Sequence, residues 1–150
     1  MKVTAMTIRP VQPNDRDEWF RMRDSLWMGS PDDHIQEIEV FFVTPQDGTT
    51  FVVERPDGGL CGFIEIRLRN YAEGCISSPV PYIEGWYVDK DMRRSKLGSR
   101  LVQAAEEWAR SQGYSEMASD TQLENKVSQQ AHQALGYQKV ERIVCFRKDL

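Results

Sequence analysis

The sequence has few of the residues that metal centres and disulfide frameworks need. It contains 2 histidines and 3 cysteines in 150 residues. Cys61, Cys75 and Cys145 form no CxxC pair and have no metal-ligand spacing, so we interpret them as reduced thiols. We therefore expect no metal site and no disulfide.

Long hydrophobic runs and an excess of positive charge are also missing. No apolar stretch approaches the roughly 20 residues of a membrane helix, and the N-terminal MKVTAMTIRP lacks the apolar core of a secretion signal. With 19 basic and 23 acidic residues the net charge is -4, whereas proteins that bind nucleic acid usually carry a basic excess. We expect a cytoplasmic protein with neither a membrane nor a nucleic acid as partner.

The composition that remains is that of an ordinary globular domain. Apolar residues make up 40% and charged residues 28% of the chain, which is typical of soluble globular proteins. The length suits one core, and we see no repeat, linker or low-complexity tract. The sequence therefore predicts a single domain over residues 1–150.

Hydrophobic periodicity predicts helices and strands in a mixed order. Helices are expected over 13–27, from Pro31 through an apolar stripe to Phe42, over Leu97–Ala109 and over Asn125–Leu135. Strands are expected over Thr4–Val11, Thr50–Glu54, Leu60–Leu68, Tyr82–Val88, Glu116–Ser119, Tyr137–Val140 and Ile143–Arg147. The turn PDGG at 56–59 joins two of them as an antiparallel hairpin. This order predicts an α/β domain whose mixed sheet carries helices on its faces.

The stretch YIEGWYVDKDMRRSKLGSRLVQAAEEWA, residues 82–109, carries the strongest chemical signal. A strand ends at Val88, a short turn contains Arg93, Arg94 and Lys96, and an amphipathic helix follows. Backbone N–H groups at a helix start are unpaired and the helix dipole adds positive charge there. Basic side chains beside them make an anion site that suits a pyrophosphate. A solvated basic helix start explains the charges alone equally well.

This stretch resembles the acetyl-CoA site of the GCN5-related N-acetyltransferases, whose turn reads Arg/Gln-x-x-Gly-x-Gly/Ala. Residues 93–98, RRSKLG, match at the first Arg and the last Gly, and Lys96 stands where the first Gly is usual. The resemblance implies the family fold, a mixed and mostly antiparallel sheet flanked by helices. It also implies that acetyl-CoA is held by Trp86, Tyr87, Val88, Arg93, Arg94, Ser95, Lys96, Leu97, Gly98 and Ser99.

A second segment, NKVSQQAHQALGY at 125–137, resembles the next motif of that family. The motif has an Asn, a helix with a small residue, and a Gly-aromatic pair. The resemblance implies that Asn125 helps to position the coenzyme. Many members have a Tyr four residues before the Gly, suggested as the acid that protonates the CoA thiolate, and here the position is His132. His132 can donate that proton, or it is a structural or adenosine-side residue.

Longer segments narrow the resemblance to the type I aminoglycoside 6'-N-acetyltransferases of Gram-negative bacteria. These segments are RDSLWMGSPDDH, NYAEGCISSPVPYIEGWYV, EMASDTQLENKVSQQAHQALGY and ERIVCFRK. The resemblance implies a cytoplasmic homodimer that confers antibiotic resistance by direct acetyl transfer from acetyl-CoA to the 6'-amine of the drug. No enzyme thiol takes part in such a transfer.

The resemblance also implies which residues meet the drug, a polycation covered in hydroxyls. Trp27 and Tyr71 face it, Glu84 lies near the reacting amine, and Asp120 and Glu141 bind ammonium groups. Glu84 is the first candidate to receive the proton of the amine and Asp120 the second. Plainer alternatives stay open, because Trp27 suits a core position, Glu141 a surface charge and Asp120 a helix cap.

Two other functions remain compatible with these residues. The same acidic site could acetylate another small cationic amine, such as a polyamine or a metabolite, or a peptide N-terminus, since a fold does not settle the substrate. A non-catalytic acyl-CoA-binding module is the second alternative, favoured by Lys96 in the phosphate turn.

Overall fold

The computed structural model describes residues 6–150. Its strands are β1 (Thr7–Pro10), β2 (Gly48–Glu54), β3 (Leu60–Arg69), β4 (Val80–Val88) and β5 (Ala118–Ser119). Its helices are α1 (Arg16–Leu26), α2 (Pro31–Val43), α3 (Leu97–Ser111) and α4 (Lys126–Ala134). The strand predicted over Thr4–Val11 corresponds to β1, and its first residues, Thr4 and Ala5, lie outside the described residues.

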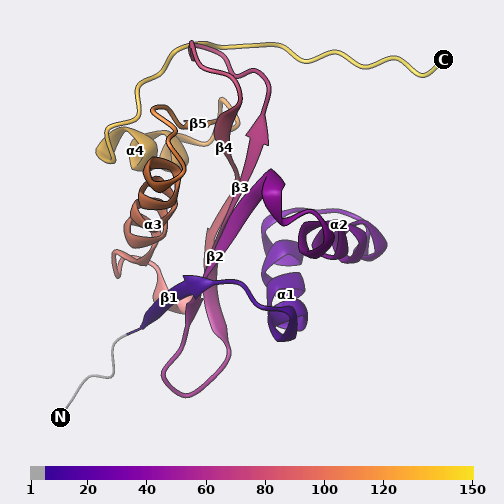
Figure 1. Cartoon of the computed structure of the whole chain (residues 1–150), viewed down its shortest axis with the longest axis vertical. Helices are drawn as coiled ribbons and strands as arrows, with labels where there is room; N and C mark the ends of the chain where they lie inside the picture. The colour runs from indigo at the N-terminus through magenta and orange to yellow at the C-terminus, as the bar shows by residue number, and fades with distance from the viewer. Residues whose placement is uncertain (1–5) are drawn as a thin grey trace.

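The strands form one sheet in the order β1-β2-β3-β4-β5. The first four pair antiparallel, and β5 joins β4 in parallel. Helices α1 and α2 lie on one side of this sheet, and α3 and α4 lie on the other (Figure 1). The predicted class is therefore confirmed: a mixed, mostly antiparallel sheet flanked by helices.

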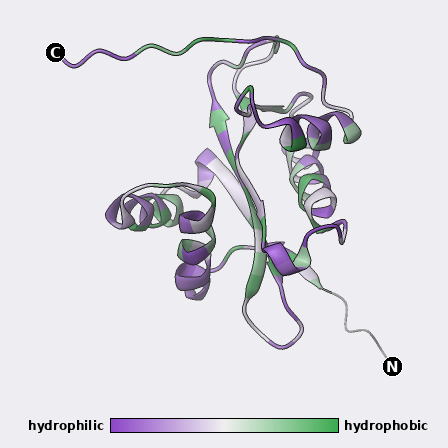
Figure 2. Ribbon diagram, turned by 180° about the vertical axis from the view of Figure 1, so that it is seen from behind, coloured by the Kyte–Doolittle hydropathy of each residue, from purple (hydrophilic) through white to green (hydrophobic). Residues whose placement is uncertain are grey.

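Two apolar clusters fill the spaces between the sheet and the helices. On the α1 and α2 side the cluster contains Trp19, Met22, Ile38, Phe41, Val52, Leu60 and Phe63. On the α3 side it contains Val53, Cys61, Ile64, Ile66, Ile83, Leu97, Leu101, Val102 and Ala105. Neighbouring residues of one strand, such as Val52 and Val53, belong to opposite clusters because strand side chains alternate between faces. Hydrophobic residues, coloured green in Figure 2, recur along the central strands.

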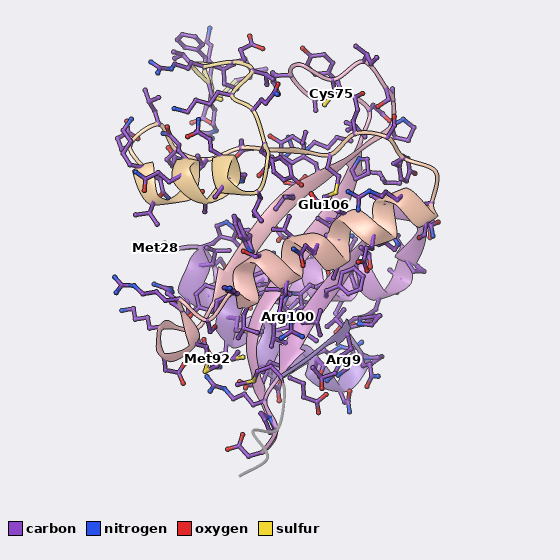
Figure 3. The ribbon with its side chains drawn as sticks, turned by 90° about the vertical axis from the view of Figure 1, so that its left-hand side faces the viewer. Arg9, Met28, Cys75, Met92, Arg100 and Glu106 are labelled. Atoms are coloured by element: carbon purple, nitrogen blue, oxygen red, sulfur yellow. The ribbon has the colours of Figure 1, made fainter. Side chains whose placement is uncertain are left out.

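Helix α3 covers its face of the sheet with one stripe of small and branched side chains. Leu97, Leu101, Val102 and Ala105 are buried against the strands, at the spacing of one helical face. Figure 3 looks onto this helix, with Arg100 near its start and Glu106 further along. The packing fixes the start of α3 next to the end of β4, which places the basic turn.

The C-terminal prediction is wrong. Residues 137–150 form neither of the strands expected over Tyr137–Val140 and Ile143–Arg147, and after α4 the chain runs away from the body as an extended tail (Figure 1). The strand expected over Glu116–Ser119 is reduced to two residues, Ala118 and Ser119. A strand forms only where another strand supplies hydrogen-bond partners, and the described part of this chain offers none to the tail.

Three further observations concern residues 6–150. No helix in this range is long and apolar enough to cross a membrane. Cys61 is buried, Cys75 half-buried and Cys145 exposed, and all three are free thiols. Within the described range, no cluster of three or more His, Cys, Asp or Glu side chains could hold a metal ion.

Candidate active site

Strand β4 is distorted at Glu84. Gly85 pairs with Glu65 of β3, and Ile83 pairs with Ile66, so the register shifts between these two pairs. Glu84 is therefore the extra residue of a β-bulge, a feature that re-aims a side chain and often lies beside active sites. The sequence places Glu84 in an apolar strand, but only the register shows that it stands at the irregularity.

The sheet also opens at this level. Strand β5 pairs with β4 only at Tyr82 with Ala118 and at Ile83 with Ser119. Beyond that point β4 continues to Val88 with a paired neighbour on its β3 side alone, within residues 6–150. The backbone of Trp86–Val88 therefore faces an open edge, where N–H and C=O groups can bind a ligand segment.

The basic turn reaches α3 through two left-handed residues. Arg94 has φ 64° and Lys96 has φ 66°, a region that residues with a Cβ adopt at a penalty of about 1–2 kcal/mol. No side chain caps the helix start, so the N–H groups of Leu97, Gly98 and Ser99 are free to meet an anion. The side chains of Arg94 and Lys96 are exposed beside them.

Aspartate 89 anchors the turn to the body. It accepts hydrogen bonds from Arg21 at 3.0 and 3.1 Å and from Arg55 at 3.2 Å. Burial by itself raises the pKa of Asp89, but the hydrogen bonds from the two guanidinium groups outweigh it and lower that pKa below its ordinary value. At the other end of the turn, Arg93 Nε donates to the carbonyl of Val88 at 2.9 Å.

The two candidates from the second motif occupy different environments. Asn125 caps α4, accepting from the N–H of Ser128 at 3.0 Å. His132 uses both ring nitrogens within the protein: Nδ1 lies 2.7 Å from the carbonyl of Ser128, and Nε2 lies 2.7 Å from Ser119 Oγ. Since a carbonyl only accepts, Nδ1 carries the proton and Nε2 accepts from the serine. This arrangement favours the structural alternative for His132.

A cleft of about 820 Å³ lies on the face of the sheet opposite to α3 and α4, between α1, α2 and the strands. Its lining includes two of the predicted substrate residues, Trp27 and Glu84. Five carboxylates line it, against two guanidinium groups: Asp33, Glu37, Asp47, Glu65 and Glu84 against Arg23 and Arg67. Such a concave, negative surface attracts a cationic ligand.

Buried charge supports the floor of the cleft. Arg23, whose side chain is 3% exposed, forms ion pairs with Glu65 and Glu37. Glu65 also accepts from Trp19 Nε1 at 2.8 Å. Burial raises the pKa of the Glu65 carboxyl, and Arg23 opposes that rise. Because the charges of Arg23 and Glu65 are paired and hydrogen-bonded, both side chains can remain buried.

Trp27 belongs to both the core and the cleft. Its ring lies against Phe63 at 6.2 Å between centroids, and the Arg23 guanidinium lies 4.8 Å from its centroid. A Cβ at Gly85 would fall 2.5 Å from the Trp27 ring, so only glycine lets the ring approach β4 this closely. The ring therefore packs closely against β4 next to Glu84, and the His34 ring stacks on it at 6.3 Å between centroids.

Glu84 is paired in this structure. Arg69 Nε donates to Oε1 at 2.7 Å and Nη2 donates to Oε2 at 2.6 Å. The same guanidinium lies 3.5 Å from the centroid of the Tyr82 ring, and Tyr82 donates its hydroxyl to Asp120 Oδ2 at 2.6 Å. The two predicted catalytic carboxylates thus stand at the ends of one row of contacts.

The other predicted substrate residues lie outside the cleft. Tyr71 is 68% exposed in the loop between β3 and β4. Asp120 is exposed just after β5, and Glu141 is exposed on the C-terminal tail. The cleft therefore joins Trp27 with Glu84, while Asp120 is reached only through Arg69 and Tyr82.

Sequence reasoning did not single out Arg69, Tyr82, Arg23 or Glu65. Arg69 and Tyr82 gave no usable signal, because an Arg at a strand end and a Tyr in an apolar strand are ordinary. Glu65 did give one, since a carboxylate inside the apolar run LCGFIEIRL needs a partner. That run could have predicted a buried ion pair, but not the identity of Arg23.

Comparison with known proteins gives a family and close relatives. The model of the acetyltransferase (GNAT) family matches residues 14–137. An aminoglycoside N(6')-acetyltransferase type 1 of Klebsiella aerogenes is 43% identical over 146 residues, covering 95% of this chain and 96% of its own. One of the same name from Serratia marcescens is 43% identical over 136 residues, covering 89% and 92%.

Solved structures agree with these relatives. The structure of AAC(6')-Iy in complex with the bisubstrate analog CoA-S-monomethyl-acetylneamine has a TM-score of 0.89 and 34% identity, covering 98% of this chain and 100% of its own. The 6'-N-acetyltransferase AAC(6')-Ih from Acinetobacter baumannii has a TM-score of 0.89 and 33% identity, covering 97% and 99%. The chain is thus similar along nearly its full length to aminoglycoside 6'-N-acetyltransferases.

Proposed function

The chain belongs to the GNAT acetyltransferases and, within them, to the aminoglycoside N(6')-acetyltransferases of type 1, and from this we propose that it acetylates the 6'-amine of aminoglycosides with acetyl-CoA and so confers resistance. One observation carries the proposal, the arrangement of two sites about the bulge at Glu84. The open edge of β4 lies beside the basic start of α3, and the acidic cleft lies across the sheet from it. The reaction takes place in the cytoplasm, where we expect the protein to reside.

Acetyl-CoA fits the α3 side of the bulge. The free N–H groups at the start of α3, with Arg94 and Lys96 beside them, suit the pyrophosphate. The open edge of Trp86–Val88 suits the pantetheine chain and the thioester. A backbone N–H there stabilises the oxyanion that develops on the thioester carbonyl. Asn125 helps to position the coenzyme from α4.

The drug occupies the acidic side. The carboxylates that line the cleft attract its ammonium groups. A sugar ring lies against the Trp27 indole, and Tyr71 lies at the rim of the cleft. Glu84 faces the reacting amine and Asp120 binds a second amine. Acidic focusing raises the local concentration of a polycation, which supports this orientation over one that places the drug on the basic face.

The chemistry is a direct transfer. The amine first loses a proton, which passes to Glu84 directly or through a water molecule. Its lone pair then attacks the carbonyl carbon and a C–N bond forms. The nitrogen gives up a second proton, the C–S bond breaks, and the departing thiolate of the coenzyme takes up that proton. Amide formation removes a positive charge from the drug and weakens its binding to RNA, which depends on charge.

We also propose that the enzyme is a homodimer. The extended tail exposes Val140, Ile143, Val144, Phe146 and Leu150, and such an apolar surface is typical of an interface. Within residues 6–150, β5 pairs only with β4, so its outer edge is free to receive a strand from a second copy. Glu141 lies on the same tail, so its contact with the drug depends on where the tail docks.

A thiol-release assay tests the function. Purified protein with acetyl-CoA and kanamycin or tobramycin should release CoA thiol in proportion to acetylated drug. Spermidine and a peptide N-terminus serve as comparison amines. Turnover of these amines with none of the aminoglycosides would favour the other acetyltransferase alternative, and acetyl-CoA binding without turnover of any amine would indicate a binding module.

A further inference from the structure

Arg69 grips the proposed proton acceptor at both of its oxygens. The two hydrogen bonds to Glu84, at 2.7 and 2.6 Å, form the two-point geometry in which an arginine fork matches a carboxylate. These bonds to Glu84 raise the pKa of Arg69 above its ordinary value. A permanently charged group therefore stands beside the residue that we expect at the reacting amine.

A rigid platform holds Arg69 in turn. The guanidinium lies 3.5 Å from the centroid of the Tyr82 ring, and Tyr82 is 3% exposed. The hydroxyl of Tyr82 is tied to Asp120. A cation stacked on a buried ring whose own hydroxyl is bonded has little freedom to turn.

Arg69 holds Glu84 from outside the cleft. Glu84, Arg67 and Leu68 line the cleft, and Arg69, the next residue of β3, does not. A two-point ion pair occupies one lone pair on each carboxylate oxygen and leaves the other free. The free lone pairs of Glu84 can therefore accept from a group in the cleft while the guanidinium stays in place.

We propose that Arg69 is a positioning residue for acetyl transfer: it fixes the Glu84 carboxylate toward the acceptor amine, and its charge favours the uncharged, nucleophilic form of that amine. The proposal rests on the proposed function, because it concerns the amine that Glu84 meets. Orientation is needed here more than elsewhere, since Glu84 projects from a bulge and has no regular ladder neighbours to fix it.

The charge effect has a definite sign. A cation near an ammonium disfavours the protonated form and lowers the pKa of the amine. For a unit charge about 6 Å away in water the shift is about half a pH unit, and it grows where water is excluded. Amine acetylation depends on the free base, so Arg69 extends activity toward lower pH.

The test compares Arg69→Gln with Arg69→Lys. For Arg69→Gln we expect kcat for tobramycin to fall about tenfold, and the acidic limb of kcat/KM against pH to move up by about half a unit or more. Arg69→Lys keeps the charge and loses the fork. It should restore the position of the limb and leave kcat low. The KM for acetyl-CoA should stay unchanged in both variants.

Arg16 offers a matched control. Its guanidinium also pairs twice with a glutamate, Glu39, at 2.5 and 3.2 Å, and lies 4.6 Å from the centroid of the Phe42 ring. This pair lies on α1 and α2, with side chains 38% and 51% exposed, outside the cleft lining. Arg16→Gln should therefore leave both kcat and the pH profile at wild-type values.

The outcomes separate the two proposals. If the wild type is active and Arg69→Gln keeps both the wild-type kcat and the wild-type position of the acidic limb, the role of Arg69 is overturned. The proposed enzyme function is then unaffected. Loss of thermal stability without movement of the limb also overturns it, because a purely structural arginine behaves that way. A wild type that acetylates no aminoglycoside contradicts the proposed function itself.

Discussion

Tyr82 and Asp120 are joined by a 2.6 Å hydrogen bond in which the phenol donates to the carboxylate. Burial raises the pKa of Tyr82, and the contact with Asp120 raises it further, so the phenol keeps its proton. The bond occupies one oxygen of Asp120 and leaves the carboxylate itself exposed just beyond β5. Asp120 is thus oriented by β4 and not by the helix that follows it.

This bond predicts that charge, not capping, is the main contribution of Asp120. Asp120→Asn keeps an acceptor for Tyr82 and removes the negative charge. We expect the KM for tobramycin to rise about tenfold, which corresponds to a lost contact of about 1.4 kcal/mol, with the melting temperature nearly unchanged. Tyr82→Phe, which keeps the charge, is the control and should change KM much less. A drop in melting temperature with normal KM would indicate a structural role.

Removal of the Glu84 carboxylate should affect turnover. Glu84→Ala and Glu84→Gln remove the proposed proton acceptor, and general base catalysis contributes a factor of about 100 or more. We expect kcat to fall at least tenfold, with an unchanged KM for acetyl-CoA, as measured by thiol release under saturating coenzyme. Wild-type turnover in both variants would remove Glu84 from the site.

The left-handed residue Lys96 in the basic turn gives a prediction with two parts. Lys96 has φ 66°, so Lys96→Gly relieves backbone strain and should stabilise the fold by about 1 kcal/mol in urea unfolding. It also removes a cation, so the KM for acetyl-CoA should rise several-fold. Lys96→Ala loses the same cation and keeps the Cβ, and we expect it to share the KM effect without the gain in stability.

Asp89 makes stability depend on acid pH. Its pKa is lowered in the folded protein relative to the ordinary value of 3.8. A lowered folded pKa contributes stability that is present above the unfolded value and is lost as the pH falls through the folded one. Asp89→Asn should therefore destabilise the protein by about 1 kcal/mol at pH 7, a modest amount since Arg21 is partly exposed.

Unfolding in urea at several pH values checks this prediction for Asp89. The difference between wild type and Asp89→Asn should shrink as the pH falls below about 4. Asp24→Asn on α1 serves as the comparison, because Asp24 is exposed and forms no ion pair within residues 6–150. A difference independent of pH would show that packing and not the ion pair matters.

The proposed dimer depends on the tail. Phe146 is 92% exposed in the single chain, so Phe146→Asp should be neutral for a monomer and disruptive for an interface that buries it. We expect light scattering to report a mass near 17.4 kDa for this variant and twice that for the wild type. Val43→Asp, at another exposed apolar position, is the control. A wild-type monomer would contradict the dimer.

Local chemistry made much of this enzyme readable from its sequence. The basic turn, the amphipathic α3 and the apolar β4 are written in consecutive residues, because helix starts and strand faces depend on neighbours a few positions away. The turn and strand lie where they were expected, and Lys96, at the position where the family usually has Gly, adopts a left-handed backbone.

Only the tertiary structure decided how the carboxylates are used. Arg69 meets Glu84 across 15 positions and Tyr82 meets Asp120 across 38, and both contacts depend on strand pairing that no local pattern specifies. The bulge at Glu84 appears only when β3 and β4 are aligned. The tail makes the same point in reverse. Its residues favour strands, yet a strand needs a partner, and the sequence of one chain does not state where that partner lies.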